Sequence, residues 1–169
     1  MERLQAEGAL VQLSERFTNS AAFGVLFREG MDLVEETAAY LDGAGRTEAK
    51  ALDRAVSLTY ATESMRLTTR LMQLASWLLL HRAVKEGEMT LGQANREKTK
   101  VKLSAADPGP EDMIAKLPQQ LQDLISRSMN LQSRVRRLDT SIHSPVTERA
   151  PIGNPLVPQL NRLKAAFER

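Results

Sequence analysis

Two histidines, His81 and His143, are the side chains in this 169-residue chain best suited to bind a transition metal. In helical proteins a carboxylate-bridged pair of metal ions needs two Glu-x-x-His pairs and two further glutamates that face inward. Leu78 and Thr140 stand three residues before the two histidines, so neither pair is present. Three glutamates could form an acidic cluster but are better interpreted as a solvated helix face or an internal ion pair: Glu35, Glu36 and Glu63. The sequence therefore predicts no metal site, no catalytic acid and no cofactor.

The remaining sequence offers no other reactive group. It contains no cysteine, which excludes disulfides, thiolate zinc sites and cysteine nucleophiles. It also lacks a glycine-rich phosphate loop before a helix and a Gly-x-Ser-x-Gly nucleophile elbow. We therefore expect a protein that is not an enzyme.

A basic stretch without acidic residues runs from Leu124 to Leu138. Its arginines could bind nucleic acid, a phosphorylated partner or an acidic protein surface, or could pair with an acidic helix face within the same domain. The second interpretation is favoured, because 23 basic against 21 acidic residues leave a net charge of only +2, too little to hold a polyanion unless the charge is segregated. Three of these arginines are kept as candidate partner-binding residues: Arg134, Arg136 and Arg137.

The most apolar segment, Leu71–Leu80, is half the length that a membrane span requires. Its residues Leu74, Trp77 and Leu78 are expected either in the core or in a dimer interface. The sequence begins MERLQAEGAL, without the basic patch and apolar run of an export signal. These features predict a cytoplasmic protein that does not enter a membrane.

A second candidate binding element lies near the end of the sequence, after prolines 145, 151 and 155. Four apolar residues recur there at i, i+4, i+7 and i+11, a spacing typical of a short helix that lies in a groove: Leu156, Leu160, Leu163 and Phe167. The groove could belong to a partner or to the same chain, and the residues alone do not decide between them.

Three amphipathic segments define the expected architecture, with helices at about residues 20–42, 47–86 and 118–142. We expect an all-α, antiparallel three-helix bundle over residues 20–142, with a long central helix. A flexible N-terminal arm (residues 1–19) and a proline-rich tail (residues 143–169) flank this bundle. The first helix is too short to cover residues 71–84, which leaves the arm, the third helix or a second copy to do so. A homodimer is therefore expected.

Two long stretches resemble one known family. They are FREGMDLVEETAAYLDGAGR (residues 27–46) and YATESMRLTTRLMQLASWLLLHRAVKEGEMT (residues 60–90), and the run EKTKVKL (residues 97–103) fits the same pattern. The chain resembles the alphaproteobacterial regulator of CtrA degradation, the RcdA family. That resemblance implies a dimerising three-helix protein that acts as an adaptor for the ClpXP protease.

The resemblance also implies a set of partners. An adaptor of this family tethers cargo, including the cell-cycle transcription factor CtrA, to a protease primed by a CpdR-like response regulator. A PopA-like effector that binds cyclic-di-GMP adds a further layer in some relatives. The family has no catalytic motif to transfer. The residues themselves leave an alternative to the adaptor role: a nucleic-acid-binding protein or a structural scaffold that uses the basic stretch.

Overall fold

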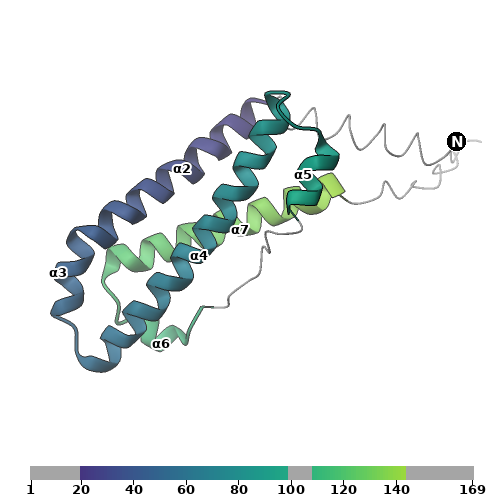
Figure 1. The fold of residues 1–169 in the computed structure, drawn as a ribbon. Coiled ribbons are helices and arrows are strands. Elements are labelled where there is room, and N and C mark those ends of the chain that lie inside the picture. The colour runs from purple at the N-terminus through teal and green to yellow at the C-terminus, as the bar shows by residue number, and fades with distance from the viewer. Residues whose placement is uncertain (1–19, 99–107, 144–169) are drawn as a thin grey trace, which may run out of the picture.

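The computed structural model describes residues 20–98 and 108–143, and within these ranges every regular element is an α-helix (Figure 1). The expected arm at 1–19 and the segment from 144 to 169 lie outside the described residues. The helices are α2 (Ala21–Asp42), α3 (Ala44–Lys50), α4 (Arg54–Lys85), α5 (Leu91–Lys98), α6 (Glu111–Ile114) and α7 (Gln119–His143). Within the described ranges, no helix has both the length and the apolar character of a membrane span.

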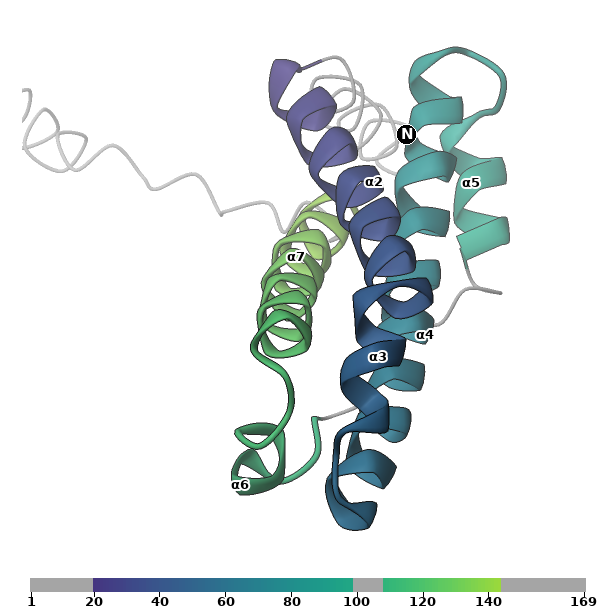
Figure 2. The ribbon, with the colours of Figure 1, turned by 90° about the vertical axis from the view of Figure 1, so that its left-hand side faces the viewer.

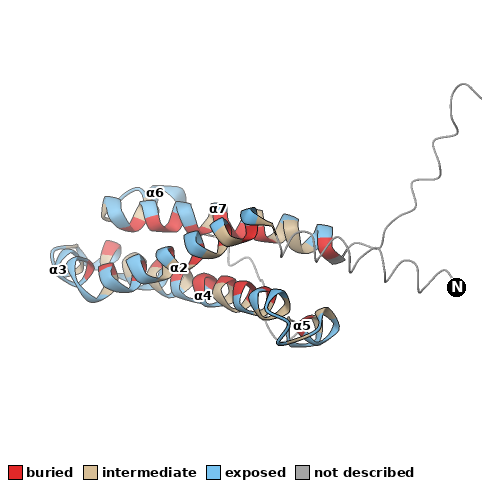
Figure 3. Ribbon diagram, turned by 90° about the horizontal axis from the view of Figure 1, so that it is seen from above, coloured by how far each residue is buried: buried red, intermediate tan, exposed pale blue. Residues whose placement is uncertain are grey.

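Helices α2, α4 and α7 form the bundle, and α4 contacts both of the others (Figures 1 and 2). At 32 residues α4 is about 48 Å long, and α2 measures about 33 Å. The expected all-α bundle with a long central helix is confirmed. Figure 3 shows that buried residues line the sides of these helices that face one another. Their core includes Phe23, Leu33, Leu67, Leu121, Leu131 and Val135.

The helix directions differ in part from an alternating antiparallel bundle. Helix α2 runs antiparallel to α4 and to α7, but α4 and α7 run parallel to each other (Figure 2). The hydrogen bonds record this, because Arg70 bonds to Ser128 and Trp77, further along α4, bonds to Asp139, further along α7. Gly109, which precedes α6, bonds to Glu63 in the N-terminal half of α4, so α7 starts beside that half.

The expected start of the central helix at about residue 47 is wrong, because α4 begins at Arg54. The chain continues past Gly43 as α3, which the Tyr40 hydroxyl holds by donating to the Glu48 carboxylate at 2.7 Å. The reversal occurs at residues 51–53, where the Asp53 carboxylate accepts a hydrogen bond from the backbone N–H of Val56 at 3.0 Å. An aspartate is a strong N-cap because its carboxylate satisfies a free amide of the first turn.

Two close approaches require glycine. Gly30 lies where α2 passes over the core, and a Cβ there would overlap the end of the Leu78 side chain. Gly45 in α3 is buried, and a Cβ there would lie 2.5 Å from the Tyr60 hydroxyl and 2.7 Å from the Tyr40 carbonyl oxygen. At Gly45 a larger residue would press on fixed backbone, whereas at Gly30 the end of the Leu78 side chain would have to move.

Candidate interaction surface

The buried charges of the bundle form a polar layer between α4 and α7. Glu63 is only 2% exposed, and its carboxylate accepts hydrogen bonds from Arg66 at 2.6 Å and from the Gly109 N–H at 3.0 Å. Arg70, 3% exposed, donates to the Ser128 hydroxyl at 2.8 Å. Burial lowers the pKa of Arg70, and the Glu63 carboxylate opposes that shift. These bonds join α4 to the segment at Gly109 and to α7.

The histidines and the other glutamates are separated from one another. His81 is buried with its ring 4.1 Å from that of Trp77, centroid to centroid, while His143 is the last residue of α7. Glu35 and Glu36 are exposed on α2. Within the described part of the chain, no three His, Asp or Glu side chains are placed to hold a metal ion.

The basic side of α7 faces the acidic side of α2. Arg134 binds both carboxylate oxygens of Glu29, at 2.7 and 2.8 Å, and Arg127 binds Glu36 at 2.7 Å. The hydrogen bond to Arg127 lowers the pKa of Glu36. Arg136 is half-buried and Arg137 is exposed. The favoured pairing of the two helix faces is confirmed at these two ion pairs, which leave less positive charge available for a nucleic acid.

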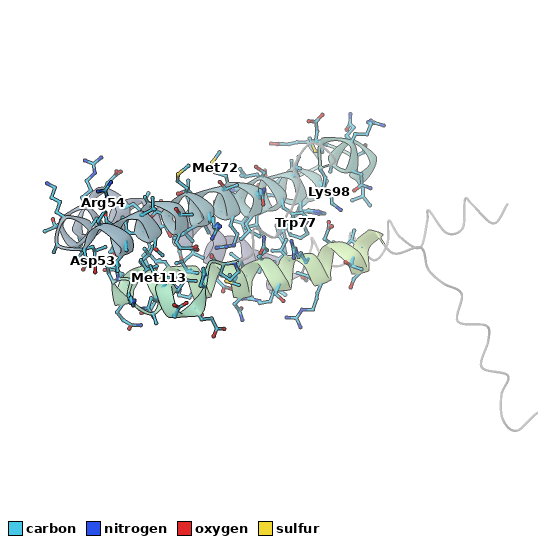
Figure 4. The ribbon with its side chains drawn as sticks, turned by 90° about the horizontal axis from the view of Figure 1, so that it is seen from below. Asp53, Arg54, Met72, Trp77, Lys98 and Met113 are labelled. Atoms are coloured by element: carbon cyan, nitrogen blue, oxygen red, sulfur yellow. The ribbon has the colours of Figure 1, made fainter. Side chains whose placement is uncertain are left out.

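Leu74, Trp77 and Leu78 all lie in the core of the single chain, each at most 1% exposed. The indole N–H of Trp77 donates to the Asp139 carboxylate at 2.9 Å, and the same carboxylate binds Lys98 of α5 at 2.5 Å. Helix α7 therefore covers the apolar half of α4. Figure 4 shows Trp77 between α4 and α7, whereas Met72 points away from α7.

The other side of α4 carries four large apolar side chains that are more than half exposed. Leu58, Met65, Met72 and Leu79 are 70%, 71%, 66% and 52% exposed, and successive members stand seven residues apart. Every exposed residue of α4 between Arg54 and Arg82 is uncharged. We call this surface the uncharged α4 face; its smaller members are Ala61, Thr62, Thr68, Thr69, Ala75 and Ser76.

Three hydroxyl groups on the uncharged α4 face are bonded to the helix itself. Thr62, Thr68 and Ser76 each donate to the carbonyl oxygen four residues earlier, at 3.0, 2.9 and 2.8 Å. Because these donors are satisfied within α4, covering them does not leave an unbonded donor. The face is therefore less polar than its threonines and serine suggest.

Two hollows adjoin this face. A shallow hollow of about 300 Å³ lies near its middle and is lined by Ser64, Met65, Thr68 and Thr69. An apolar groove of about 180 Å³ runs between α2 and α4, lined by Val34, Thr37, Ala38, Leu41, Thr68, Leu71, Met72 and Ala75. We call the second one the α2–α4 groove. Both are shaped to accept side chains from outside the bundle.

Comparisons with known proteins identify the family. A family model described as a protein of unknown function (DUF1465) matches residues 14–167. The crystal structure of RcdA from Caulobacter crescentus CB15 is 52% identical in sequence, covers 76% of this chain and 96% of its own, and superposes with a TM-score of 0.63. This chain belongs to the RcdA family. A search of the curated proteins found no match.

In this RcdA-family chain, the interpretation of the sequence overlooked the uncharged α4 face. The available signal was the seven-residue spacing of Leu58, Met65, Met72 and Leu79. Leu156, Leu160, Leu163 and Phe167 lie outside the described residues.

Proposed function

We propose that this RcdA-family protein is a non-enzymatic adaptor that helps deliver substrates, such as a cell-cycle transcriptional regulator, to the ClpXP protease. The supporting observation is the 52% identity to RcdA over 96% of that chain. Its proposed partners in the cytoplasm are ClpXP, a CpdR-like response regulator, a PopA-like effector and a CtrA-like substrate.

The described surface suits this role physically. An adaptor accelerates degradation by raising the effective concentration of cargo at the protease, which requires exposed binding surfaces and no reacting groups. The uncharged α4 face supplies such a surface on a rigid helix. Large exposed apolar patches on monomers mark interaction sites.

A reconstituted degradation reaction tests the adaptor role. Purified ClpXP and a CpdR-like response regulator are mixed with a CtrA-like substrate, and substrate loss is followed with and without the chain. We expect faster loss with the chain, at a level that saturates with its concentration. Caulobacter RcdA serves as the positive control. If RcdA accelerates the reaction and this chain does not at any concentration, the proposed role is wrong.

We further infer that two copies pair along the uncharged α4 face. The order of large residues on this face is Leu58, Met65, Met72, Leu79, which reads the same in both directions about a point between Thr68 and Thr69. A twofold axis at that point would run the two α4 helices antiparallel and place Leu58 opposite Leu79 of the second copy. A twofold interface requires this kind of self-complementary surface.

The same twofold axis would place a large side chain of one copy beside a hollow of the other. Met72 of the second copy would lie opposite Met65, beside the hollow lined by Ser64, Met65, Thr68 and Thr69. The small residues would also face one another. A strict seven-residue repeat is the spacing that keeps one seam in contact along two helices, with side chains packed into holes.

Cysteine cross-linking tests this pairing sharply, because the native chain has no cysteine. A mixture of Leu58→Cys and Leu79→Cys chains should form disulfide-linked pairs, whereas Leu58→Cys alone should not, since its two copies would lie about 32 Å apart at 1.5 Å per residue. Cross-linking of Leu58→Cys alone would indicate a parallel pair and refute the antiparallel arrangement.

Sedimentation equilibrium gives an independent test of the same interface. Met65→Glu with Met72→Glu should shift the chain to monomer, because each charge would be buried against an apolar surface. The matched control is Val25→Glu on α2, whose native side chain is 54% exposed. A native chain that is monomeric at tens of micromolar would refute the homodimer.

A further inference from the structure

The α2–α4 groove has an apolar floor and one buried hydroxyl. Four side chains of α2 and four of α4 line it, and together they expose almost no polar atoms. Thr37 is 3% exposed, and its hydroxyl has no hydrogen-bond partner among the described residues. A buried hydroxyl left without a partner is uncommon in folded proteins. The groove therefore has the character of a site that accepts an apolar segment.

The two rims of the groove differ in charge. On the α2 side, Glu35 and Asp42 are exposed and lie three and four residues from Ala38, which lines the groove. Side chains at these spacings are neighbours on a helix surface. Asp42 is 81% exposed, and its 3.7 Å contact with Arg46 is a weak surface ion pair. The α4 side is uncharged, so the groove favours an amphipathic segment with positive charge along one edge.

The chain itself contains such a segment. Leu156, Leu160, Leu163 and Phe167 share the helical spacing i, i+4, i+7 and i+11, and Arg162 and Lys164 stand between them. Helices with apolar anchors at such spacings bind in apolar grooves of other proteins. On a helix Lys164 lies beside one edge of this apolar stripe and matches the acidic α2 rim, whereas Arg162 lies on the opposite side.

The segment can reach the groove. The Trp77–Asp139 hydrogen bond places these residues at the same level, and α7 ends four residues later at His143. Met72 lies five residues earlier on α4, so the axial separation is about 14 Å, and crossing two helices adds about 20 Å. Residues 144–155 can span about 40 Å when extended.

We propose that the segment of residues 156–167 binds in the α2–α4 groove of its own chain, with its apolar residues on the groove floor and Lys164 along the α2 rim. The segment thereby covers Thr68 and Met72, which also belong to the uncharged α4 face. Docking of the segment and pairing of two copies then compete for these two residues; this consequence alone rests on the proposed homodimer.

Disulfide formation in the full chain tests the docking. The test variant carries Ala38→Cys in the groove and Leu160→Cys in the segment. The control carries Val25→Cys with Leu160→Cys. Val25 lies four residues before Glu29, and Glu29 pairs with Arg134 in the C-terminal half of α7. Val25 is therefore closer than Ala38 to the end of α7, so the length of the connecting chain alone would favour the control disulfide. Under mild oxidation we expect the intramolecular disulfide to form at least tenfold faster in the test variant.

Two further variants separate a specific site from random contact. Adding Leu163→Asp and Phe167→Asp should return the test variant to the control rate. Glu35→Lys with Asp42→Lys should slow the reaction most at low salt, where exposed charges are least screened. The fluorescence of Trp77 checks that each bundle is folded.

Each result either supports or overturns the docking of residues 156–167 in the α2–α4 groove. Equal rates in the test and control variants would overturn the docking, and so would a rate that Leu163→Asp and Phe167→Asp leave unchanged. Disulfides that form between chains, with a rate that rises with concentration, would assign the groove to the segment of a second copy and overturn binding within one chain. The degradation assay and the Leu58–Leu79 cross-link are measured separately, so failure here is distinguishable from failure of the proposed function.

Discussion

Replacing Glu63 by Gln should destabilise the bundle by about 2 kcal/mol, because it removes a buried negative charge that several groups share. The Gly109 N–H would bond to a neutral oxygen, and hydrogen bonds to charged groups contribute about 1 kcal/mol more than neutral ones. The ion pair to Arg66 adds at most about 1 kcal/mol, since Arg66 is 36% exposed to solvent. Arg70, nearly fully buried, loses its nearby carboxylate as well.

A second substitution at the same position should cost more. Glu63→Ala leaves the Gly109 N–H without its acceptor and Arg70 without a compensating charge, and breaking a buried pair in this way costs roughly 3 to 5 kcal/mol. Glu63→Gln should therefore be more stable than Glu63→Ala. The exposed Glu35→Gln, which removes a charge of the same sign, is the matched control and should change stability by less than about 0.5 kcal/mol.

Urea denaturation followed by Trp77 fluorescence measures these differences. Trp77 is the only tryptophan in the sequence and lies in the core, so its emission reports the bundle directly. A Glu63→Gln variant as stable as Glu35→Gln would show that the carboxylate contributes no net stabilisation. An equal loss for Gln and Ala would refute the assignment of the larger cost to uncompensated buried groups.

Two further predictions concern the corner of the bundle and its surface charge. Gly45→Ala should lower the free energy of unfolding by roughly 1 to 3 kcal/mol, because its Cβ would press on the Tyr60 hydroxyl and on fixed backbone. Gly24→Ala, with open space around it, should raise the free energy of unfolding by about 0.5 kcal/mol. Glu36 has a lowered pKa in the folded chain, so its stabilisation is present above the unfolded value of 4.5 and is lost as the pH falls through the folded pKa. In urea titrations at pH 7, Glu36→Gln should thus be less stable than the native chain, by less than about 1 kcal/mol because the pair is exposed. This difference in stability should vanish in acid. A difference that persists at pH 2 would refute the ion pair with Arg127 as its cause.

The parts of the fold that could be predicted are those set by local periodicity. The apolar stripe that includes Phe23, Leu26 and Phe27 predicted a helix over residues 20–42, and α2 covers Ala21–Asp42. Gly87 also marks the end of α4, where its φ of 74° lies in the left-handed region that glycine adopts readily. Such signals depend on neighbours within a few residues, so the sequence shows them directly.

The features that were missed depend on distant residues. The central helix was expected to begin at about residue 47, yet residues 44–50 form the separate helix α3, where Tyr60 from the next helix packs against Gly45. The parallel arrangement of α4 and α7 depends on how the chain returns between them, which no local pattern records. Trp77 could have served the core or an interface equally well until Asp139 was placed beside it.

The uncharged α4 face was missed for a physical reason that also supports its proposed role. A helix with a single buried side shows one apolar stripe, but α4 carries apolar residues on two sides and therefore shows no simple amphipathic pattern. Leu67, Leu71, Leu74 and Leu78 recur at three- and four-residue steps and are buried in the chain's own core. Leu58, Met65, Met72 and Leu79 recur at seven and remain exposed. A straight helix drifts by about 20° per seven residues, so a line of apolar residues at this spacing stays in contact only with a partner helix that coils around it. The second periodicity thus indicates an interface outside the bundle.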